Sequence, residues 1–282
     1  MSLLDEAQVE RAAAGLRLRL PRGPHRGRVG EVRANSVGSS MELHDFRTYH
    51  PGDDVRHLDW NAVARTGELV LRVRQEEVSP RVEVVLDASK SMGVTDAKAA
   101  RARELALWTC VLAQRAGLEV SLVVAGERGH KAAGVAAHAA IRQVKFDGRA
   151  PFDEAVRRAP PLLPCGLRVV VSDLLFEVRA EPFAEKLARG AAGLAVIQVL
   201  DEEDLDPSGG IGARLVDSES SEFLERILTP AVLDDYRERL ESHQKMWREA
   251  AQRVRASLVT VSAEHEASVL ARGPLAPLTE AA

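Results

Sequence analysis

The chain has 282 residues, enough for one large α/β domain with an appendage or for two small domains. It is 45% hydrophobic and 28% charged, as is usual for globular proteins that fold in water, and its net charge of −4 gives no reason to expect nucleic-acid binding. The first residues lack the basic and apolar segments of a secretory signal, and no uncharged apolar run reaches the roughly 18 residues of a membrane span. We therefore expect a cytoplasmic protein without a membrane span of its own.

An N-terminal basic, β-rich extension is predicted over residues 1–80, ahead of an α/β domain over 81–282. A short amphipathic start, 3–14, leads into an arginine-rich stretch and later into a β segment over 68–74. No aromatic residue is interleaved with the arginines, so we expect a solvated or partner-facing arm and not a nucleic-acid site. The arginines are Arg17, Arg19, Arg22, Arg26, Arg28 and Arg33.

Five short apolar runs alternate with helical segments in the rest of the chain. The runs are rich in Val, Ile and Leu and lack strict alternation, which is typical of strands buried on both faces of a parallel sheet. Helical patterns cover 98–116, 152–158 and 182–189. This alternation predicts a doubly wound, mostly parallel, Rossmann-like α/β sheet. The five runs are Val82–Leu86, Val120–Ala125, Leu167–Val171, Leu194–Leu200 and Leu258–Val261.

The last long helical pattern, over 230–256, has an apolar stripe on an otherwise charged surface. The stripe fits either a coiled-coil seam or one helix docking on the sheet, and docking is favoured because His243 interrupts it. Before this helix, residues 201–228 turn acidic and glycine-bearing. That composition predicts an exposed loop and then a short hairpin of 214–216 and 223–228.

The segment Asp-Ala-Ser-Lys-Ser at 87–91 closes an apolar strand and carries oxygen donors at alternate positions. Ligand sites in open parallel sheets form beyond the carboxyl ends of the strands, so Asp87, Ser89 and Ser91 are expected in that crevice. One carboxylate and two hydroxyls make half of the octahedral oxygen shell that Mg²⁺ prefers. Asp173 follows another strand at the equivalent place and supplies a second carboxylate. The alternative is that these residues merely cap the turn into the next helix.

This combination resembles the metal-ion-dependent adhesion site of von Willebrand factor A domains. The resemblance implies that the four side chains hold Mg²⁺ or Mn²⁺, and that the metal binds an acidic side chain of a partner because its ligands are mostly neutral. In that family a threonine from a third loop completes the set. Residues 147–151 read Asp-Gly-Arg-Ala-Pro here, and Ala150, at the threonine position, has no oxygen to offer. The metal shell is therefore expected to be incomplete.

A second signal lies near the N-terminus, where residues 46–60 read Phe-Arg-Thr-Tyr-His-Pro-Gly-Asp-Asp-Val-Arg-His-Leu-Asp-Trp, followed by Ala-Arg-Thr-Gly at 64–67. Pro-Gly-Asp-Asp is a turn sequence in which Asp and Arg side chains pair or cap, and Trp60 is expected in a core. His57 with its acidic neighbours could instead form a second metal or acid–base cluster, although charged turns are commoner than catalytic ones. The acidic neighbours are Asp53, Asp54 and Asp59.

This motif, ahead of the strand that ends in Asp87, resembles the bacterial domain-of-unknown-function-58 (DUF58) family over nearly the whole chain. The resemblance implies a von Willebrand factor A-like domain with a β-rich N-terminal extension. It also implies partnership with a MoxR-type AAA+ ATPase, whose genes commonly accompany those of the family. Many members of the family carry N-terminal transmembrane helices. This chain shows no such segment and resembles the shorter, soluble members of the family.

The leading functional hypothesis is a non-enzymatic protein-interaction module, an accessory or adaptor of a MoxR-type ATPase, whose crevice engages an acidic residue of that ATPase or its client. The alternatives are a metal-dependent hydrolase with Asp173 or His57 as base, and a structural scaffold with a vestigial site. The sequence has no P-loop, HExxH or GxSxG motif. Its two cysteines, Cys110 and Cys165, lack CxxC spacing and are expected to be reduced thiols.

Overall fold

The computed structural model describes residues 6–21, 45–49, 58–73, 81–207, 214–216, 223–265 and 271–282. The chain divides into two compact units. One consists of Met1–Arg22 together with Ser79–Ala282, and the other is Gly23–Val78. The beginning of the chain therefore belongs with the larger unit.

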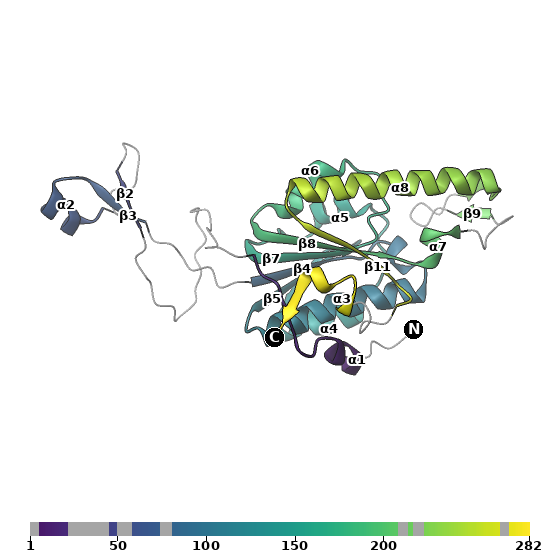
Figure 1. Ribbon diagram of the computed structural model, residues 1–282, viewed down its shortest axis with the longest axis horizontal. Coiled ribbons are helices and arrows are strands. Elements are labelled where there is room, and N and C mark those ends of the chain that lie inside the picture. The colour runs from purple at the N-terminus through teal and green to yellow at the C-terminus, as the bar shows by residue number, and fades with distance from the viewer. Residues whose placement is uncertain are drawn as a thin grey trace. The chain divides into compact units, whose positions relative to one another are not determined.

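A six-stranded sheet forms the centre of the larger unit (Figure 1). Its strands are β4 (Arg81–Asp87), β5 (Glu119–Ala125), β6 (His130–Ala133), β7 (Cys165–Ser172), β8 (Ala191–Leu200) and β11 (Ser257–Ser262). They are ordered β11-β8-β7-β4-β5-β6, and every neighbouring pair is parallel except β5 and β6. The predicted doubly wound, mostly parallel α/β sheet is confirmed, and each of the five apolar runs lies inside an observed strand of the sheet.

Helices cover both faces of this sheet (Figure 1). One face carries α1 (Glu6–Ala12), α3 (Asp96–Arg115) and α4 (Val135–Gln143), and the other carries α5 (Phe152–Arg158), α6 (Ala180–Ala188) and α8 (Pro230–Arg253). Successive side chains of a strand point to opposite faces, so β4 sends Val84 and Leu86 into the core with α3 and Val85 into the core with α5 and α6. Burial on both faces explains the uninterrupted apolar runs in the sequence.

The order of the strands reverses at β4. The chain passes from β4 through α3 to β5 on one side, and later adds β7, β8 and β11 on the other side. In open α/β sheets the ligand crevice lies at such a switch point, beyond the carboxyl ends of the strands. In this chain the switch point is where β4 ends at Asp87 and β7 ends at Ser172.

The long helix α8 docks on the sheet and is not a free coiled-coil segment. Its apolar stripe is buried at Leu233, Leu240 and Trp247, and Trp247 packs against the rings of Phe176 and Phe183. The predicted hairpin before α8 is present as the antiparallel strands β9 (Arg214–Val216) and β10 (Phe223–Ile227). Within the described residues, no helix is long and apolar enough to cross a membrane.

The sequence patterns do not reveal some features of this unit. The edge strand β6 reads His-Lys-Ala-Ala and is only partly buried, so it has no apolar run to mark it. The short strands β1 (Leu16–Leu18) and β12 (Thr279–Ala281) pair antiparallel, although they are far apart in the sequence. Such pairing is set by tertiary contacts and not by a local pattern.

The small unit contains β2 (Asp45–Thr48) paired antiparallel with β3 (Val70–Val73), and the helix α2 (Trp60–Thr66). The expectation that Trp60 lies in a core is wrong, because its side chain is 65% exposed on a helix that buries none of its residues. The Pro-Gly-Asp-Asp turn and His57 lie outside the described residues. So do four arginines of the arginine-rich stretch: Arg22, Arg26, Arg28 and Arg33.

Asp59, which the sequence offered as part of a charged cluster, caps the helix α2. Its Oδ1 accepts hydrogen bonds from the N–H groups of Asn61 (3.0 Å) and Ala62 (3.1 Å). Gly67 ends the helix in a left-handed conformation with φ of 72°. Both ends of α2 are therefore fixed by local sequence.

A buried ion pair crosses the sheet between β4 and β7. Glu83 and Arg168 are partners in the strand register, both side chains are fully buried, and Arg168 Nε lies 2.9 Å from Glu83 Oε2. Lys131 Nζ donates to the other oxygen of Glu83 at 2.9 Å. The remaining guanidinium N–H groups donate to the carbonyl oxygens of Leu163, Leu187 and Arg189. A buried guanidinium satisfied in this way fixes the strands to the loops that surround it.

Replacing Arg168 with methionine is expected to lower the free energy of unfolding by about 3 kcal/mol or more, because Glu83 then loses a buried partner. Urea denaturation followed by circular dichroism measures the change. The matched control is Arg157→Met, which breaks an ion pair between an exposed arginine and a partly buried Asp153 and should cost less than about 1 kcal/mol. Similar losses in the two variants would contradict this role for Arg168.

Candidate functional site

The turn that follows β4 places a buried carboxylate beside two hydroxyls. Asp87 is fully buried, and its Oδ1 accepts a hydrogen bond from the N–H of Ser89 at 2.9 Å. The hydroxyl oxygens of Ser89 and Ser91 lie 2.9 Å apart, so one donates to the other. Ser89 is buried and Ser91 is half-buried, which makes Ser91 the more accessible of the pair.

The second wall of the site is the loop that follows β7. Ser172 Oγ donates to Asp87 Oδ2 at 2.6 Å and accepts from the N–H of Leu174 at 3.0 Å. Asp173 Oδ1 accepts from the N–H of Leu175 at 3.1 Å. The sequence singled out Asp173 but not Ser172, whose hydroxyl is the direct link between the ends of β4 and β7.

The backbone of this loop is constrained at Leu174. The residue is fully buried with φ of 57°, a left-handed conformation that is unfavourable for a branched apolar residue. His243 Nε2, on α8, lies 2.6 Å from the carbonyl oxygen of Leu174 and accepts a hydrogen bond from Trp247 Nε1 at 3.0 Å. Gln198 Nε2 donates to the carbonyl oxygen of Asp173 at 2.9 Å.

The third loop also reaches the site. Gly148 pairs with Ser89 in an isolated parallel bridge: its N–H donates to the carbonyl oxygen of Ala88 at 3.1 Å, and its carbonyl oxygen accepts from the N–H of Lys90 at 2.9 Å. A side chain at Gly148 would place a Cβ only 2.9 Å from the oxygen of Ala88, so the close approach requires glycine. Ala150 follows two residues later and contributes no oxygen.

The two carboxylates repel each other. Burial, followed by the charge of Asp173, raises the pKa of Asp87 to about 7, although hydrogen bonds from Ser172 and Ser89 oppose the shift. Among the described residues, Asp87 has no cationic partner, whereas Asp173 has one. A carboxylate whose ionised form is disfavoured in this way gains stability when a cation arrives.

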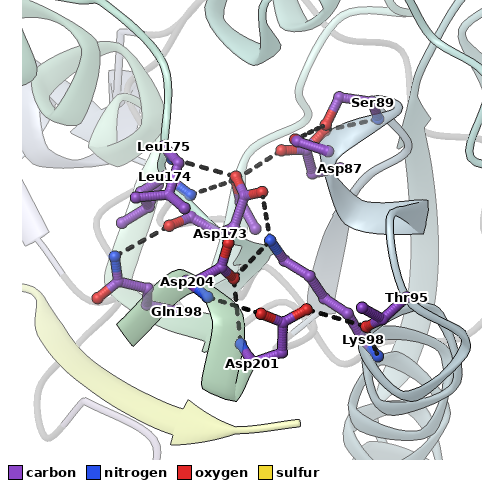
Figure 2. Close-up of polar contacts among 12 residues, drawn as sticks. Asp87, Ser89, Thr95, Lys98, Asp173, Leu174, Leu175, Gln198, Asp201 and Asp204 are labelled. Atoms are coloured by element: carbon purple, nitrogen blue, oxygen red, sulfur yellow. Dashed lines mark hydrogen bonds and ion pairs between the residues drawn. The ribbon is translucent and has the colours of Figure 1, made fainter. Parts of the chain in front are cut away.

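Asp173 does have a cationic partner, and the sequence analysis missed it. Lys98, in the first turn of α3, is 1% exposed, and its Nζ lies 2.9 Å from Asp173 Oδ2 and 2.7 Å from Asp204 Oδ2 (Figure 2). Burial alone would lower the pKa of Lys98, but the two carboxylates raise it above its ordinary value. Lysines in helix sequences normally lie at the surface, so the sequence alone gives no signal for this one.

The short helix α7 (Glu202–Leu205) presents Asp204 to Lys98. Asp201 and Asp204 form a capping box: Asp201 Oδ1 accepts from the N–H of Asp204 at 2.8 Å, and Asp204 Oδ2 accepts from the N–H of Asp201 at 3.1 Å. Thr95 Oγ1 donates to Asp201 Oδ2 at 2.9 Å, and the hydroxyl of Tyr236 donates to the carbonyl oxygen of Asp204 at 2.5 Å. Figure 2 shows how these contacts join α7 to the start of α3.

The oxygen donors of the site match those that Mg²⁺ or Mn²⁺ prefers. The 2.9 Å between the hydroxyl oxygens of Ser89 and Ser91 is close to the separation of adjacent ligands in an octahedral shell, about 3.0 Å for bonds of about 2.1 Å. Asp173 Oδ2 accepts no well-aligned hydrogen bond from the described residues, despite the ion pair with Lys98. Within the same residues, no group of three or more His, Cys, Asp or Glu side chains is placed to hold a metal ion. A cation at this crevice would therefore depend on the hydroxyls.

Asp87→Asn is expected to change the pH dependence of stability in buffer that contains a chelator. The folded-state pKa of Asp87, about 7, lies above its unfolded value, so the wild-type protein loses stability as pH rises toward 7, by at most about 1.4 kcal/mol per pH unit. The asparagine variant lacks this loss and should gain on wild type between pH 5 and pH 8. Thermal unfolding at several pH values measures the difference, and parallel curves for the two proteins would contradict the assignment.

Known proteins from several bacteria resemble the chain. The uncharacterized proteins Rv1480 of Mycobacterium tuberculosis and Mb1516 of Mycobacterium bovis are each 27% identical to it over 225 residues, which cover 73% of this chain and 70% of theirs. Among solved structures, the conserved hypothetical protein BatB of Bacteroides thetaiotaomicron is similar with a TM-score of 0.42 and 17% identity. An aerotolerance-related membrane protein of Bacteroides fragilis has a TM-score of 0.42 and 15% identity. Each of these two alignments covers 71% of this chain and 98% of the other.

The family model described as "Protein of unknown function DUF58" matches residues 45–246. The matched residues include α2, both walls of the site at Asp87 and Asp173, and most of α8. They make up well over half of the chain. The chain therefore belongs to the DUF58 family.

Proposed function

We propose that this chain is a non-enzymatic protein-interaction module whose crevice holds Mg²⁺ or Mn²⁺ and, through the cation, an acidic side chain of a partner protein. The observation that carries the proposal is the pair of serine hydroxyls, 2.9 Å apart, next to the uncompensated carboxylate of Asp87 at the switch point of the sheet. Ser89 and Ser91 would hold the cation together with Asp87 and Asp173. The cation would supply a Lewis-acidic position for a carboxylate oxygen of the partner.

The charges in the crevice explain why an acidic partner would need the cation. Burial, and after it the negative charge of Asp173, already raises the pKa of Asp87. A third carboxylate arriving from a partner would be repelled by both in the absence of a cation. Binding is therefore expected to depend on the divalent ion and to be lost on chelation.

The partner we propose is a MoxR-type AAA+ ATPase or one of its clients, as the resemblance to the family implies. An adaptor role is supported by the contacts of the two carboxylates, neither of which is free to act as a general base in the part of the chain that the structure describes. Both oxygens of Asp87 accept hydrogen bonds from the protein, and Asp173 is paired with Lys98. A hydrolase would need one of these carboxylates, or another base, free to take a proton from water.

Titration of the protein with Mn²⁺ by isothermal calorimetry tests the cation site. Asp87→Ala is expected to weaken binding at least about tenfold, since even indirect partners of metal ligands contribute that much. Ala150→Thr is expected to tighten binding, because it restores a hydroxyl on the loop that Gly148 anchors beside Ser89. Absence of heat with both wild type and Ala150→Thr would favour the scaffold hypothesis instead.

The proposed partner is tested by a pull-down of a MoxR-type ATPase from the cells that produce this protein, with and without a chelator. Capture is expected with Mg²⁺ present, and it should be lost with chelator and in Asp87→Ala. The variant Arg157→Met, which alters an exposed residue of α5, serves as a control that should bind normally. Capture that persists unchanged in chelator and in Asp87→Ala would overturn the cation-bridged mode of binding.

A further inference from the structure

The most unusual side chain in the described part of the molecule is the ammonium of Lys98. It is buried at the carboxyl ends of the strands, with Asp173 at 2.9 Å and Asp204 at 2.7 Å. Removing a lysine ammonium from water costs several kcal/mol before its partners compensate the loss. A lysine that only covered apolar surface would keep its ammonium in solvent. Lys98 instead brings a positive charge directly to a carboxylate of the candidate cation site.

We propose that Lys98 is a built-in competitor of the divalent cation: it occupies Asp173 in the cation-free protein and sets how tightly the site binds Mg²⁺ or Mn²⁺. This inference rests on the proposed function, because it concerns the same site. Asp173 Oδ2 is the atom that Lys98 contacts, and the other oxygen, Oδ1, is engaged by the N–H of Leu175. A divalent cation at Oδ2 would lie close to the ammonium, and repulsion between the two positive charges makes them compete for this oxygen.

Asp204 gives the ammonium a place to remain when it leaves Asp173. It already contacts Lys98 Nζ more closely than Asp173 does, and the capping box with Asp201 holds its carboxylate in position. The hydroxyl of Tyr236, on α8, fixes its backbone carbonyl. The ammonium of Lys98 can therefore leave Asp173 and stay paired with Asp204. A cation then takes the place of the ammonium at Asp173.

The contacts of α7 also connect the movement of Lys98 between Asp173 and Asp204 to the surface of the protein. Asp204 is intermediate in exposure, and Leu205 beside it is 41% exposed. A shift of Lys98 toward Asp204 therefore changes the charge balance at a helix that solvent can reach. Cation binding and the position of α7 are coupled through this one ammonium.

Mn²⁺ binding to three variants tests the proposal, with the loss of the free Mn²⁺ signal in electron paramagnetic resonance as readout. Lys98→Met should bind about tenfold more tightly than wild type, because the competing charge is gone. Asp204→Asn should bind more weakly, because the ammonium loses its other carboxylate and stays on Asp173. The double variant has the same local net charge as wild type and should still bind several-fold more tightly, because Asp173 is free.

The double variant separates direct competition from a general effect of charge. If it binds Mn²⁺ as wild type does, Lys98 acts only through net charge and the proposal is overturned. It also lacks the excess buried carboxylate of Lys98→Met, so it provides the measurement if that single variant does not fold. Unchanged affinity in Asp204→Asn likewise overturns the proposal.

Lys131→Met is the matched control, since Lys131 also pairs with a buried carboxylate, Glu83 at 2.9 Å, at a site remote from Asp87. Its Mn²⁺ affinity should equal that of wild type. If neither wild type nor the double variant binds Mn²⁺, the cation site itself is refuted and this inference falls with it. If wild type binds and the Lys98 variants bind equally well, the cation site stands and only the role of Lys98 is refuted.

Discussion

Two carboxylates buried at the ends of neighbouring parallel strands are the constraint on which the rest of this site depends. Asp87 and Asp173 lie at the switch point of the sheet, where main-chain and side-chain groups converge. Burying carboxylates is unfavourable unless hydrogen bonds or cations compensate them. The chain compensates them unequally. Asp173 receives a lysine, whereas Asp87 receives only hydrogen bonds and keeps a raised pKa near neutrality.

Toward the opposite ends of β4 and β7, a second pair of buried charges is fully compensated. Glu83 and Arg168 are also fully buried, but the donors of Arg168 are distributed over a carboxylate and surrounding carbonyl oxygens, and Lys131 completes the partners of Glu83. The charges of Glu83 and Arg168 are therefore matched by partners within the protein, and we assign this cluster a role in stabilising the fold. Within the residues that the structure describes, Asp87 receives hydrogen bonds but no cation, and its pKa is raised. Groups with perturbed pKa values are concentrated at functional sites.

The sequence predicted the central strands and the placement of Asp87 and Asp173 because both follow from regular rules. Strands buried on both faces must be continuously apolar, and parallel strands end at the same edge of a sheet. Lys98 and the exposed Trp60 escaped prediction because burial of a single side chain depends on tertiary packing. Gly148 escaped too, since the close approach that requires a glycine becomes visible only when the third loop lies against Ala88. The turn around His57 lies outside the described residues, so a metal or acid–base cluster there stays a hypothesis.

The left-handed backbone at Leu174 has a consequence for recognition. Its N–H is held by Ser172 and its carbonyl oxygen lies beside His243, so the loop that carries Asp173 contacts the sheet and α8 at once. Strain of this kind persists only where surrounding contacts determine the conformation. The loop is thus shaped before anything binds, and association loses little conformational entropy there. Under the proposed function, selectivity at this site would come from the rigidity of the loop more than from closure of the loop around a bound side chain.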